Sequence, residues 1–296
     1  MPRFALCTAF LAALLPMLAQ AQESPTLKKI REAGSIVLGH RESSIPFSYY
    51  DDRQQVVGYS HELMLGVVEA IKRELRLPAL EVKLLPVTSS NRIPLLQNGS
   101  IDLECGSTTN NLERQKQVAF STSIFIIGTR LLNKKGAGVG EFSDLAGRNV
   151  VTTAGTTSER LLRRMNEEKQ MKMSIISAKD HGESFLTLET GRAVAFMMDD
   201  ALLYGEIAKA KRPADWQVTG TPQSKEAYGC MLRKDDPAFK KLVDAALSRA
   251  MTSGEAERIY NKWFMNPIPP KGLNLNMPLS DEMKALYKAP NDRAYE

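Results

Sequence analysis

Short apolar runs alternate with amphipathic stretches along most of the chain. Six runs have the length and composition of strands: Ile36–Gly39, Leu80–Leu85, Ile101–Glu104, Asn149–Thr152, Met173–Ser177 and Ala193–Met198. A short apolar run bounded by polar residues is typical of a buried strand. The alternation of these strands with helical stretches predicts an α/β fold, in which parallel sheets are covered by helices on both faces.

Several stretches have the apolar period of amphipathic helices. Ser60–Leu75 places its apolar residues on one face. The helix predicted for Thr156–Glu167 should begin with a capping box, because Glu159 follows Thr156 by three residues. Further helices are predicted at Leu242–Met251 and Ala256–Phe264, and a short amphipathic segment that should pack on the body of the protein at Ser280–Lys288.

Two extended stretches are interpreted as crossings between two lobes. One is Phe125–Leu132, and the other is Val218–Leu232, which contains Gly220, Pro222 and Gly229. The block between them forms a complete unit of strands and helices. We therefore predict a discontinuous lobe 1, made of residues 22–128 and 224–296, with lobe 2, residues 129–223, inserted into it.

The first 21 residues have the pattern of a secretory signal peptide. Arg3 is followed by an apolar stretch to Leu18, and Ala19-Gln20-Ala21 fits the small-x-small cleavage rule. The apolar stretch is shorter than the ~20 residues that span a bilayer, so a cleaved signal is favoured over a membrane anchor. We expect an exported mature chain that begins at Gln22.

Cysteine usage fits export. Cys7 lies inside the predicted signal, which leaves Cys105 and Cys230 in the mature chain. An even pair of cysteines in an oxidising compartment favours a disulfide, and two buried thiols are the alternative. Closing a loop of this length would stabilise the fold by ~4–5 kcal/mol.

Composition and charge exclude some classes of function but do not identify one. The 296 residues are 43% hydrophobic and 25% charged, which is ordinary for a globular protein. The net charge of +5 comes from basic and acidic residues interleaved along the chain. The densest basic run, Lys209–Arg212, is short and is interpreted as a solvated helix end, so no nucleic-acid partner is expected.

Polar residues follow each predicted strand at its carboxyl end, where ligands bind in open parallel sheets. They include Arg41, Ser89, Arg92, Ser107, Thr109 and Arg114 in lobe 1, and Thr157, His181 and Asp199 in lobe 2. Arginine pairs with carboxylates in a bidentate geometry, a helix amino terminus offers free N–H groups to an anion, and an acid can pair with an ammonium group. This set suits a small zwitterion with excess negative charge. With His181 neutral, three arginines and Asp199 sum to +2, which would be costly to bury without an anionic ligand.

Each of these residues also has a structural interpretation. Any single arginine can be a surface charge, the Ser and Thr clusters can be helix caps, and His181 can be a core histidine. Asp200 can point inward in place of Asp199 and leave the other acid as a helix cap. The hypothesis depends on all of these residues converging.

Other motifs predict no cofactor, metal or catalytic nucleophile. The three histidines lack metal-ligand spacing, and the two mature cysteines are far apart, so zinc is not expected. The glycines in 136–140 lack the spacing of a dinucleotide loop, and no Gly-x-Ser-x-Gly elbow is present.

Four segments resemble the glutamate/aspartate-binding members of the periplasmic solute-binding proteins that serve ABC importers (amino-acid-binding family 3). They are Gly39–Tyr50, Asn91–Leu96, Glu104–Asn111 and Ala195–Asp200, and the resemblance runs from about Leu27 to Asp292. It implies a type II periplasmic binding protein fold, with two α/β lobes joined by two hinge strands and a ligand cleft between them. It also implies a Cys105–Cys230 disulfide, a periplasmic location, a monomer, and an ABC permease and ATPase as partners.

The resemblance implies a role for each candidate residue. The α-carboxylate of L-glutamate or L-aspartate would be held by Arg114, Thr109 and the N–H groups near Thr157. The α-ammonium would be held by Asp199 and Ser107, and the side-chain carboxylate by Arg41, Ser89, Arg92 and His181. Two alternatives remain: a dehydratase-like enzyme on the same scaffold, for which His181 and Asp199 are the only acid–base candidates, and a sensor that signals through a membrane partner.

Overall fold

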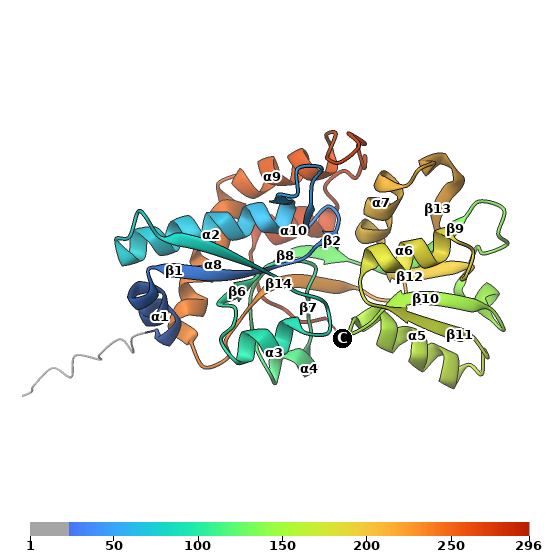
Figure 1. Cartoon of the computed structure of the whole chain (residues 1–296), viewed down its shortest axis with the longest axis horizontal. Coiled ribbons are helices and arrows are strands. Elements are labelled where there is room, and N and C mark those ends of the chain that lie inside the picture. The colour runs from blue at the N-terminus through green and yellow to red at the C-terminus, as the bar shows by residue number, and fades with distance from the viewer. Residues whose placement is uncertain (1–23, 296) are drawn as a thin grey trace, which may run out of the picture.

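The protein is described here by a computed structural model that covers residues 24–295. The predicted signal peptide (residues 1–21), Cys7 and the predicted first mature residue, Gln22, lie outside the described residues. Figure 1 shows two lobes joined by strands that pass from one to the other. None of the helices in residues 24–295 is both long and apolar enough to cross a membrane.

The first lobe is built on a six-stranded sheet of order β5-β1-β6-β14-β7, with β8 beside β14. β1 is parallel to β5 and β6, whereas β14 is antiparallel to β6, β7 and β8. A three-stranded sheet of short strands (β2–β4) follows β1 in the chain. The strands are β1 Ser35–His40, β2 Ser43–Ser44, β3 Ser48–Tyr50, β4 Val56–Val57, β5 Glu81–Pro86, β6 Leu103–Glu104, β7 Thr109–Asn110, β8 Ala119–Ile127 and β14 Glu226–Leu232.

Helices cover this sheet, and a cluster of aromatic rings fills the layer between them. Phe47, Phe125 and Phe264 pack against one another and against Tyr59 and Tyr260, all of them buried. Burial of such large rings is a main source of core stability. The helices are α1 Pro25–Ala33, α2 Tyr59–Leu75, α3 Arg92–Gln97, α4 Leu112–Gln115, α8 Pro237–Thr252, α9 Glu255–Phe264 and α10 Asp281–Lys288.

The second lobe is built on a five-stranded sheet of order β11-β10-β12-β9-β13. β10 is parallel to β11 and β12, and β9 is antiparallel to β12 and β13. The strands are β9 Thr129–Lys134, β10 Asn149–Thr153, β11 Ser174–Ala178, β12 Ala195–Asp199 and β13 Trp216–Thr219. The helices are α5 Thr157–Glu168, α6 His181–Glu189 and α7 Asp200–Lys209, with 3-10 turns at Phe142–Leu145 and Pro213–Asp215.

All six predicted strands are present, but two expectations about them were wrong. The sheets are mixed, because the segments that cross between lobes add antiparallel strands. β5 is exposed or half-buried along its whole length and β11 is buried only at Ala178, although the sequence predicted buried strands; Leu84 in β5 is 42% exposed. Both strands are sheet edges, so an apolar composition did not distinguish an edge strand from a central one.

The start of α5 shows half of the predicted capping box. The Thr156 side chain accepts a hydrogen bond from the Glu159 N–H (3.0 Å), as expected of the residue that caps the helix. The Glu159 carboxylate accepts from the Gly155 N–H (2.8 Å) instead of from the backbone of Thr156. Gly155 itself has a φ of +76°, a left-handed conformation that favours glycine.

The two segments that connect the lobes run side by side. β8 passes into β9 through Gly128 alone, and residues 220–225 lead from β13 to β14. The Gln223 N–H donates to the Thr129 carbonyl (3.0 Å), and the Thr129 N–H donates to the Ser224 hydroxyl (3.3 Å). A side chain at Gly128 would lie 3.1 Å from the Ser224 carbonyl oxygen, so glycine permits this close approach.

The predicted disulfide is confirmed. It joins Cys105, directly after β6, to Cys230 in β14, across a sequence separation of 125. The bond therefore ties the amino-terminal part of the first lobe to the strand that returns from the second.

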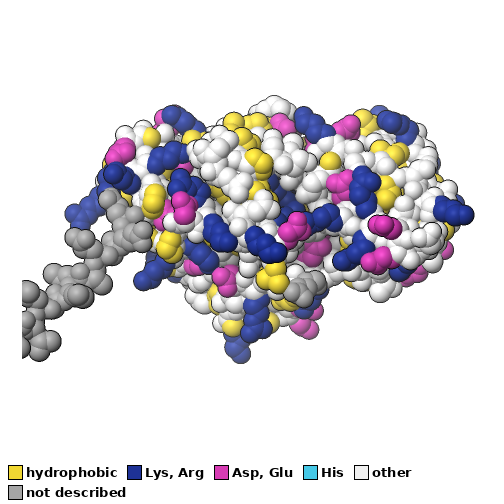
Figure 2. Space-filling model, turned by 90° about the horizontal axis from the view of Figure 1, so that it is seen from below, with side chains coloured by type: hydrophobic (Ala, Val, Ile, Leu, Met, Phe, Trp, Pro, Cys, Tyr) yellow, Lys and Arg dark blue, Asp and Glu magenta, His cyan; other side chains and the backbone are white. Residues whose placement is uncertain are grey.

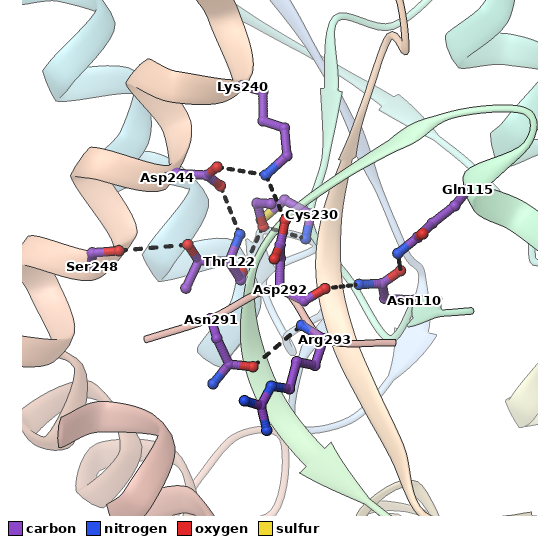
Figure 3. Close-up of polar contacts among 11 residues, drawn as sticks. Asn110, Gln115, Thr122, Cys230, Lys240, Asp244, Ser248, Asn291, Asp292 and Arg293 are labelled. Atoms are coloured by element: carbon purple, nitrogen blue, oxygen red, sulfur yellow. Dashed lines mark hydrogen bonds and ion pairs between the residues drawn. The ribbon is translucent and has the colours of Figure 1, made fainter. Parts of the chain in front are cut away.

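The predicted amphipathic segment near the end of the chain is α10, and it packs on β8 and α8. The Ile126 N–H donates to the Met283 sulfur (3.2 Å), and the Tyr287 and Tyr59 hydroxyls are 2.7 Å apart. Figure 3 shows how the following tail is held: Asn110 of β7 donates to the Asp292 carbonyl (2.9 Å), and Lys240 of α8 contacts the Asp292 carboxylate. The tail thus ends beside the strands that connect the lobes.

Charges on the surface are mixed in sign. On the face drawn in Figure 2, lysines and arginines alternate with acidic side chains and small apolar areas, and no continuous basic band is visible. The interleaved charges of the sequence therefore remain interleaved on this face.

Candidate functional site

The nine candidate residues lie where the lobes meet, at strand ends or in the first turns that follow. Arg41 follows β1, Thr109 begins β7, and Asp199 ends β12. Eight of the nine are buried and Thr157 is half-buried. The others are Ser89 in the turn after β5, Arg92 at the start of α3, Ser107 between β6 and β7, Arg114 in α4, Thr157 at the start of α5 and His181 at the start of α6.

The three arginines converge on the segment between β6 and β7. Arg41 donates to the Ser107 hydroxyl (3.3 Å) and Arg92 to the Ser107 carbonyl (3.2 Å). Arg92 also contacts the Thr108 hydroxyl, and Arg114 donates to the Thr109 carbonyl (2.9 Å). This segment therefore holds all three guanidinium groups in place.

Burial lowers the pKa of all three guanidinium groups. The pKa of Arg41 falls to about 10 and that of Arg114 to about 9, first through loss of solvation and then through the positive charge of Arg92. The pKa of Arg92 is lowered mainly by burial. All three remain cations at neutral pH, so the site carries three closely spaced positive charges.

Asp199 lies within the same cluster and is reached from both lobes. It accepts hydrogen bonds from the Ser158 hydroxyl (3.0 Å) and the Thr129 hydroxyl (3.3 Å), and it contacts the Tyr228 hydroxyl. Burial, followed by the nearby charge of Glu226, raises the pKa of Asp199 to about 7. Asp200, by contrast, begins α7 and accepts from the Ala201 N–H (2.7 Å).

His181 is buried and its imidazole is neutral. Its Nδ1 lies 2.9 Å from the Thr153 hydroxyl, and its Nε2 has no hydrogen-bond partner among the described residues. Burial, then the charges of Arg41 and Arg92, hold the pKa of His181 well below its usual range. The ring can therefore offer one donor or one acceptor to a ligand, but not a positive charge.

The two lobes are closed against each other across this cluster. Arg114 donates to the Gly155 carbonyl of the second lobe (3.2 Å), and the Gly182 N–H donates to the Ser43 hydroxyl of the first (3.4 Å). A side chain at Gly155 would lie 2.7 Å from the Ser90 hydroxyl and 2.8 Å from its Cα. The loop before α5 thus lies directly against the turn before α3.

The comparisons with known proteins identify the family. A model of the bacterial extracellular solute-binding proteins, family 3, matches residues 36–266. The chain belongs to this family. Among family 3 relatives, the glutamate/aspartate import solute-binding protein of Salmonella typhimurium is 67% identical over 269 residues, covering 91% of this chain and 89% of that protein.

Two further comparisons support the family and the fold. The glutamate/aspartate import solute-binding protein of Escherichia coli is 64% identical over 293 residues, covering 97% of each chain. The solved structure of an ancestral arginine-binding protein bound to arginine superposes with a TM-score of 0.71 at 27% identity, covering 78% of this chain and 98% of that one. The predicted type II periplasmic binding protein fold is confirmed.

Four buried polar atoms in the cluster of this family 3 protein have no hydrogen-bond partner in the part of the chain that the structure describes. They are the Ser89 hydroxyl, Arg92 Nε and His181 Nε2, which can donate, and the acceptor Glu104 Oε1. Leaving such a group unsatisfied costs about 1–3 kcal/mol, and native proteins contain few of them. These atoms come from residues of both lobes.

Sequence reasoning missed two buried carboxylates that change the charge balance. Glu104 accepts from the Thr108 hydroxyl (2.7 Å) and acts electrostatically on Arg41 and Arg92, while Glu226 acts on Arg114. With Asp199 they place three carboxyl groups beside the three guanidinium groups, so the tally of +2 was incomplete. The sequence analysis chose residues that follow a predicted strand. Glu104 is the last residue of a predicted strand and Glu226 lies in a predicted crossing segment, so neither was chosen.

Proposed function

We propose that the protein captures L-glutamate or L-aspartate between its two lobes and delivers it to an ABC importer. The observation that carries the proposal is the convergence of three buried arginines with unpartnered polar atoms of Ser89, Arg92 and His181 across the lobe boundary. A small dicarboxylate is an acceptor-only group at both ends and matches guanidinium donors in a bidentate geometry. The names of the Salmonella and E. coli relatives agree with this ligand class.

Each part of the ligand is assigned to a group of residues. The α-carboxylate is assigned to Arg114, Thr109 and the N–H groups at Thr157, because these lie together at the start of α5, where a helix amino terminus favours an anion. The α-ammonium is assigned to Asp199, the acid within the cluster, together with Ser107. The side-chain carboxylate is assigned to Arg41, Ser89, Arg92 and His181, the group that contains three unpartnered atoms able to donate.

Binding requires the lobes to open and close. We assign residues 22–128 and 224–296 to lobe 1 and residues 129–223 to lobe 2, with the segments around Gly128 and 220–225 as hinges. Ligand docks on the arginines of lobe 1, and lobe 2 then closes over it. Closure excludes water, and each ion pair strengthens in the lower dielectric.

Calorimetry with three amino acids tests the proposal. Glutamate and aspartate should bind, and a micromolar affinity would correspond to ~8 kcal/mol. Glutamine has the shape of glutamate but an amide in place of the carboxylate, so its N–H groups would face guanidinium donors, and it should bind much more weakly. Equal affinity for glutamine and glutamate would remove the dicarboxylate assignment.

The setting of this function is also proposed. Residues 1–21 would direct export to the periplasm and be removed, and the monomer would present its closed form to the permease of an importer driven by an ATPase. Mass spectrometry of the exported protein should give an amino terminus at Gln22. Growth on glutamate as sole nitrogen source should then require the gene for this protein together with those for a permease and an ATPase.

A further inference from the structure

Glu226, which no sequence pattern indicated, has an unusual set of partners. Glu226 is the first residue of β14, its side chain is buried, and its two oxygens lie within hydrogen-bond distance of four hydroxyl groups. Oε2 accepts from Thr109 (2.7 Å) and Thr157 (2.8 Å), and Oε1 accepts from Ser224 (2.9 Å); the Thr129 hydroxyl, whose one proton is also within reach of Asp199, lies 3.4 Å from Oε1. An ionised carboxylate has lone-pair sites enough to accept from all of these groups.

The two donors to Oε2 come from opposite lobes. Thr109 belongs to β7, which pairs with β14 in the first lobe, and Thr157 is the first residue of α5 in the second lobe. Their hydroxyl oxygens are 3.4 Å apart. When the lobes separate, Glu226 stays with Thr109 in the first lobe, so the bond from Thr157 must break.

We propose that Glu226 is a latch between the lobes, which stabilises the closed form and slows ligand release. The inference rests on the proposed function, since it assumes that ligand leaves through opening of the cleft. Glu226 is a positioning residue: it fixes the hydroxyls of Thr109 and Thr157, both assigned to the α-carboxylate. As an acceptor-only anion it offers no donor to that group.

A second contact between the lobes serves as the matched control. The Arg160 guanidinium of α5 contacts the Glu113 carboxylate of α4, so this ion pair also spans the lobe boundary. Both side chains are largely exposed, however, and exposed pairs contribute little because water and salt screen them. The Glu113→Ala substitution therefore removes a contact between the lobes that contributes little to the stability of the closed form.

The experiment measures lobe opening and ligand release on the full mature chain. Cysteines introduced at the exposed positions Glu32 of α1 and Glu168 of α5 carry a donor and an acceptor dye, with the native disulfide intact. Single-molecule energy transfer gives the closed fraction without ligand and with saturating glutamate. Stopped-flow displacement gives the dissociation and association rate constants, and near-ultraviolet circular dichroism checks the fold.

Glu226→Ala should lower the closed fraction of the ligand-free protein and raise the glutamate dissociation rate by about tenfold or more, since the lost bonds are to a charged acceptor. The association rate should change by less than about threefold, because opening does not hinder encounter. Glu226→Gln keeps the shape and one acceptor, so it should shift both quantities in the same direction by a smaller factor. Glu113→Ala should leave both quantities unchanged.

Three outcomes decide the matter. If Glu226→Ala has the wild-type closed fraction and dissociation rate, the latch is overturned. If that variant does not fold, Glu226→Gln decides on the same two readouts, and wild-type values in it overturn the proposal as well. If the wild-type protein binds no dicarboxylate, the proposed function fails, but the closed fraction of the ligand-free variants still tests the latch.

Discussion

The raised pKa of Asp199 predicts that ligand affinity falls as the pH is lowered through 7. In the ligand-free protein, burial and then the negative charge of Glu226 raise this pKa to about 7, against the hydrogen bonds from Tyr228 and Ser158. The α-ammonium assigned to Asp199 would favour the ionised carboxylate and lower the pKa again. Binding below pH 7 must therefore release a proton, and the affinity must weaken as protons compete.

The size of the effect follows from the pKa. At pH 5.5 Asp199 would be roughly 3% ionised in the ligand-free state, so the affinity for glutamate should be about 30-fold weaker than at pH 8, or about 2 kcal/mol. The side-chain carboxylate of glutamate ordinarily has a pKa of about 4.3 and stays ionised over this range. The pKa of His181 lies well below its usual value, so its neutral ring does not contribute.

The assay is calorimetric titration with glutamate from pH 8 to pH 5.5, in two buffers of different ionisation enthalpy at each pH. The difference between buffers counts the protons released. Asp199→Asn serves as the control and should bind weakly with little dependence on pH. A wild-type dissociation constant that stays within twofold over this range, with no proton released, would refute the pairing of Asp199 with the ammonium group.

The same pKa predicts the opposite trend for the stability of the ligand-free protein. A carboxyl whose pKa is higher in the folded than in the unfolded state stabilises the fold at low pH, and this contribution is lost as the pH rises through the folded-state pKa. The contribution of Asp199 should therefore decline between about pH 4 and 7. Ligand-free Asp199→Asn should lack this part of the pH dependence in thermal unfolding.

Three substitutions test separate parts of the structure. Arg92→Ala should weaken glutamate binding at least about tenfold while circular dichroism stays unchanged, because Arg92 is buried among the proposed ligand contacts; an unchanged dissociation constant would place it outside the pocket. Gly155→Ala should keep the lobes apart and weaken binding, because its φ is +76° and a Cβ would meet Ser90 at 2.7 Å; wild-type affinity in calorimetry would contradict the close approach. Cys230→Ser should lower the free energy of unfolding in urea by about 4–5 kcal/mol through loss of the long closed loop; an unchanged midpoint would show that the bond does not constrain the unfolded chain.

A simple geometric rule let the sequence predict most of the residues that the structure brings together in the candidate site. Parallel strands end at the same edge of a sheet, so residues directly after β1 and β6 share one edge in the first lobe, and residues directly after β10 and β12 share one in the second. Arg41 and Asp199 were found in this way. The rule cannot locate a residue on a strand that arrives from the other lobe, which is why Glu226 and Tyr228 of β14 were missed. No local pattern records that an antiparallel strand returns beside Thr109.

Local patterns also failed where a tertiary neighbour decided the outcome. The spacing of Thr156 and Glu159 predicted a reciprocal cap, but the Glu159 carboxylate binds the Gly155 N–H and also the Arg163 and Ser177 side chains. β5 has the composition of a buried strand, yet it forms an edge. In both cases the structure satisfies the local preference only in part. The rest is decided by contacts between residues far apart in the sequence, which a local pattern does not record.

Because Glu104 and Glu226 lie beside the arginines, the hydrogen-bonding groups of the site support a dicarboxylate ligand better than its net charge does. With three carboxyl groups, Asp199, Glu104 and Glu226, beside them, the three guanidinium groups demand an anion less strongly than the sequence tally implied. What remains unsatisfied in the cluster are the Ser89 hydroxyl, Arg92 Nε and His181 Nε2, together with one acceptor, Glu104 Oε1. When His181 Nδ1 accepts from Thr153, its Nε2 carries the proton, and the first three groups are then all able to donate. A carboxylate satisfies these three donors with its lone pairs, whereas the amide of glutamine brings donors of its own, so the three groups favour a dicarboxylate for a reason independent of net charge.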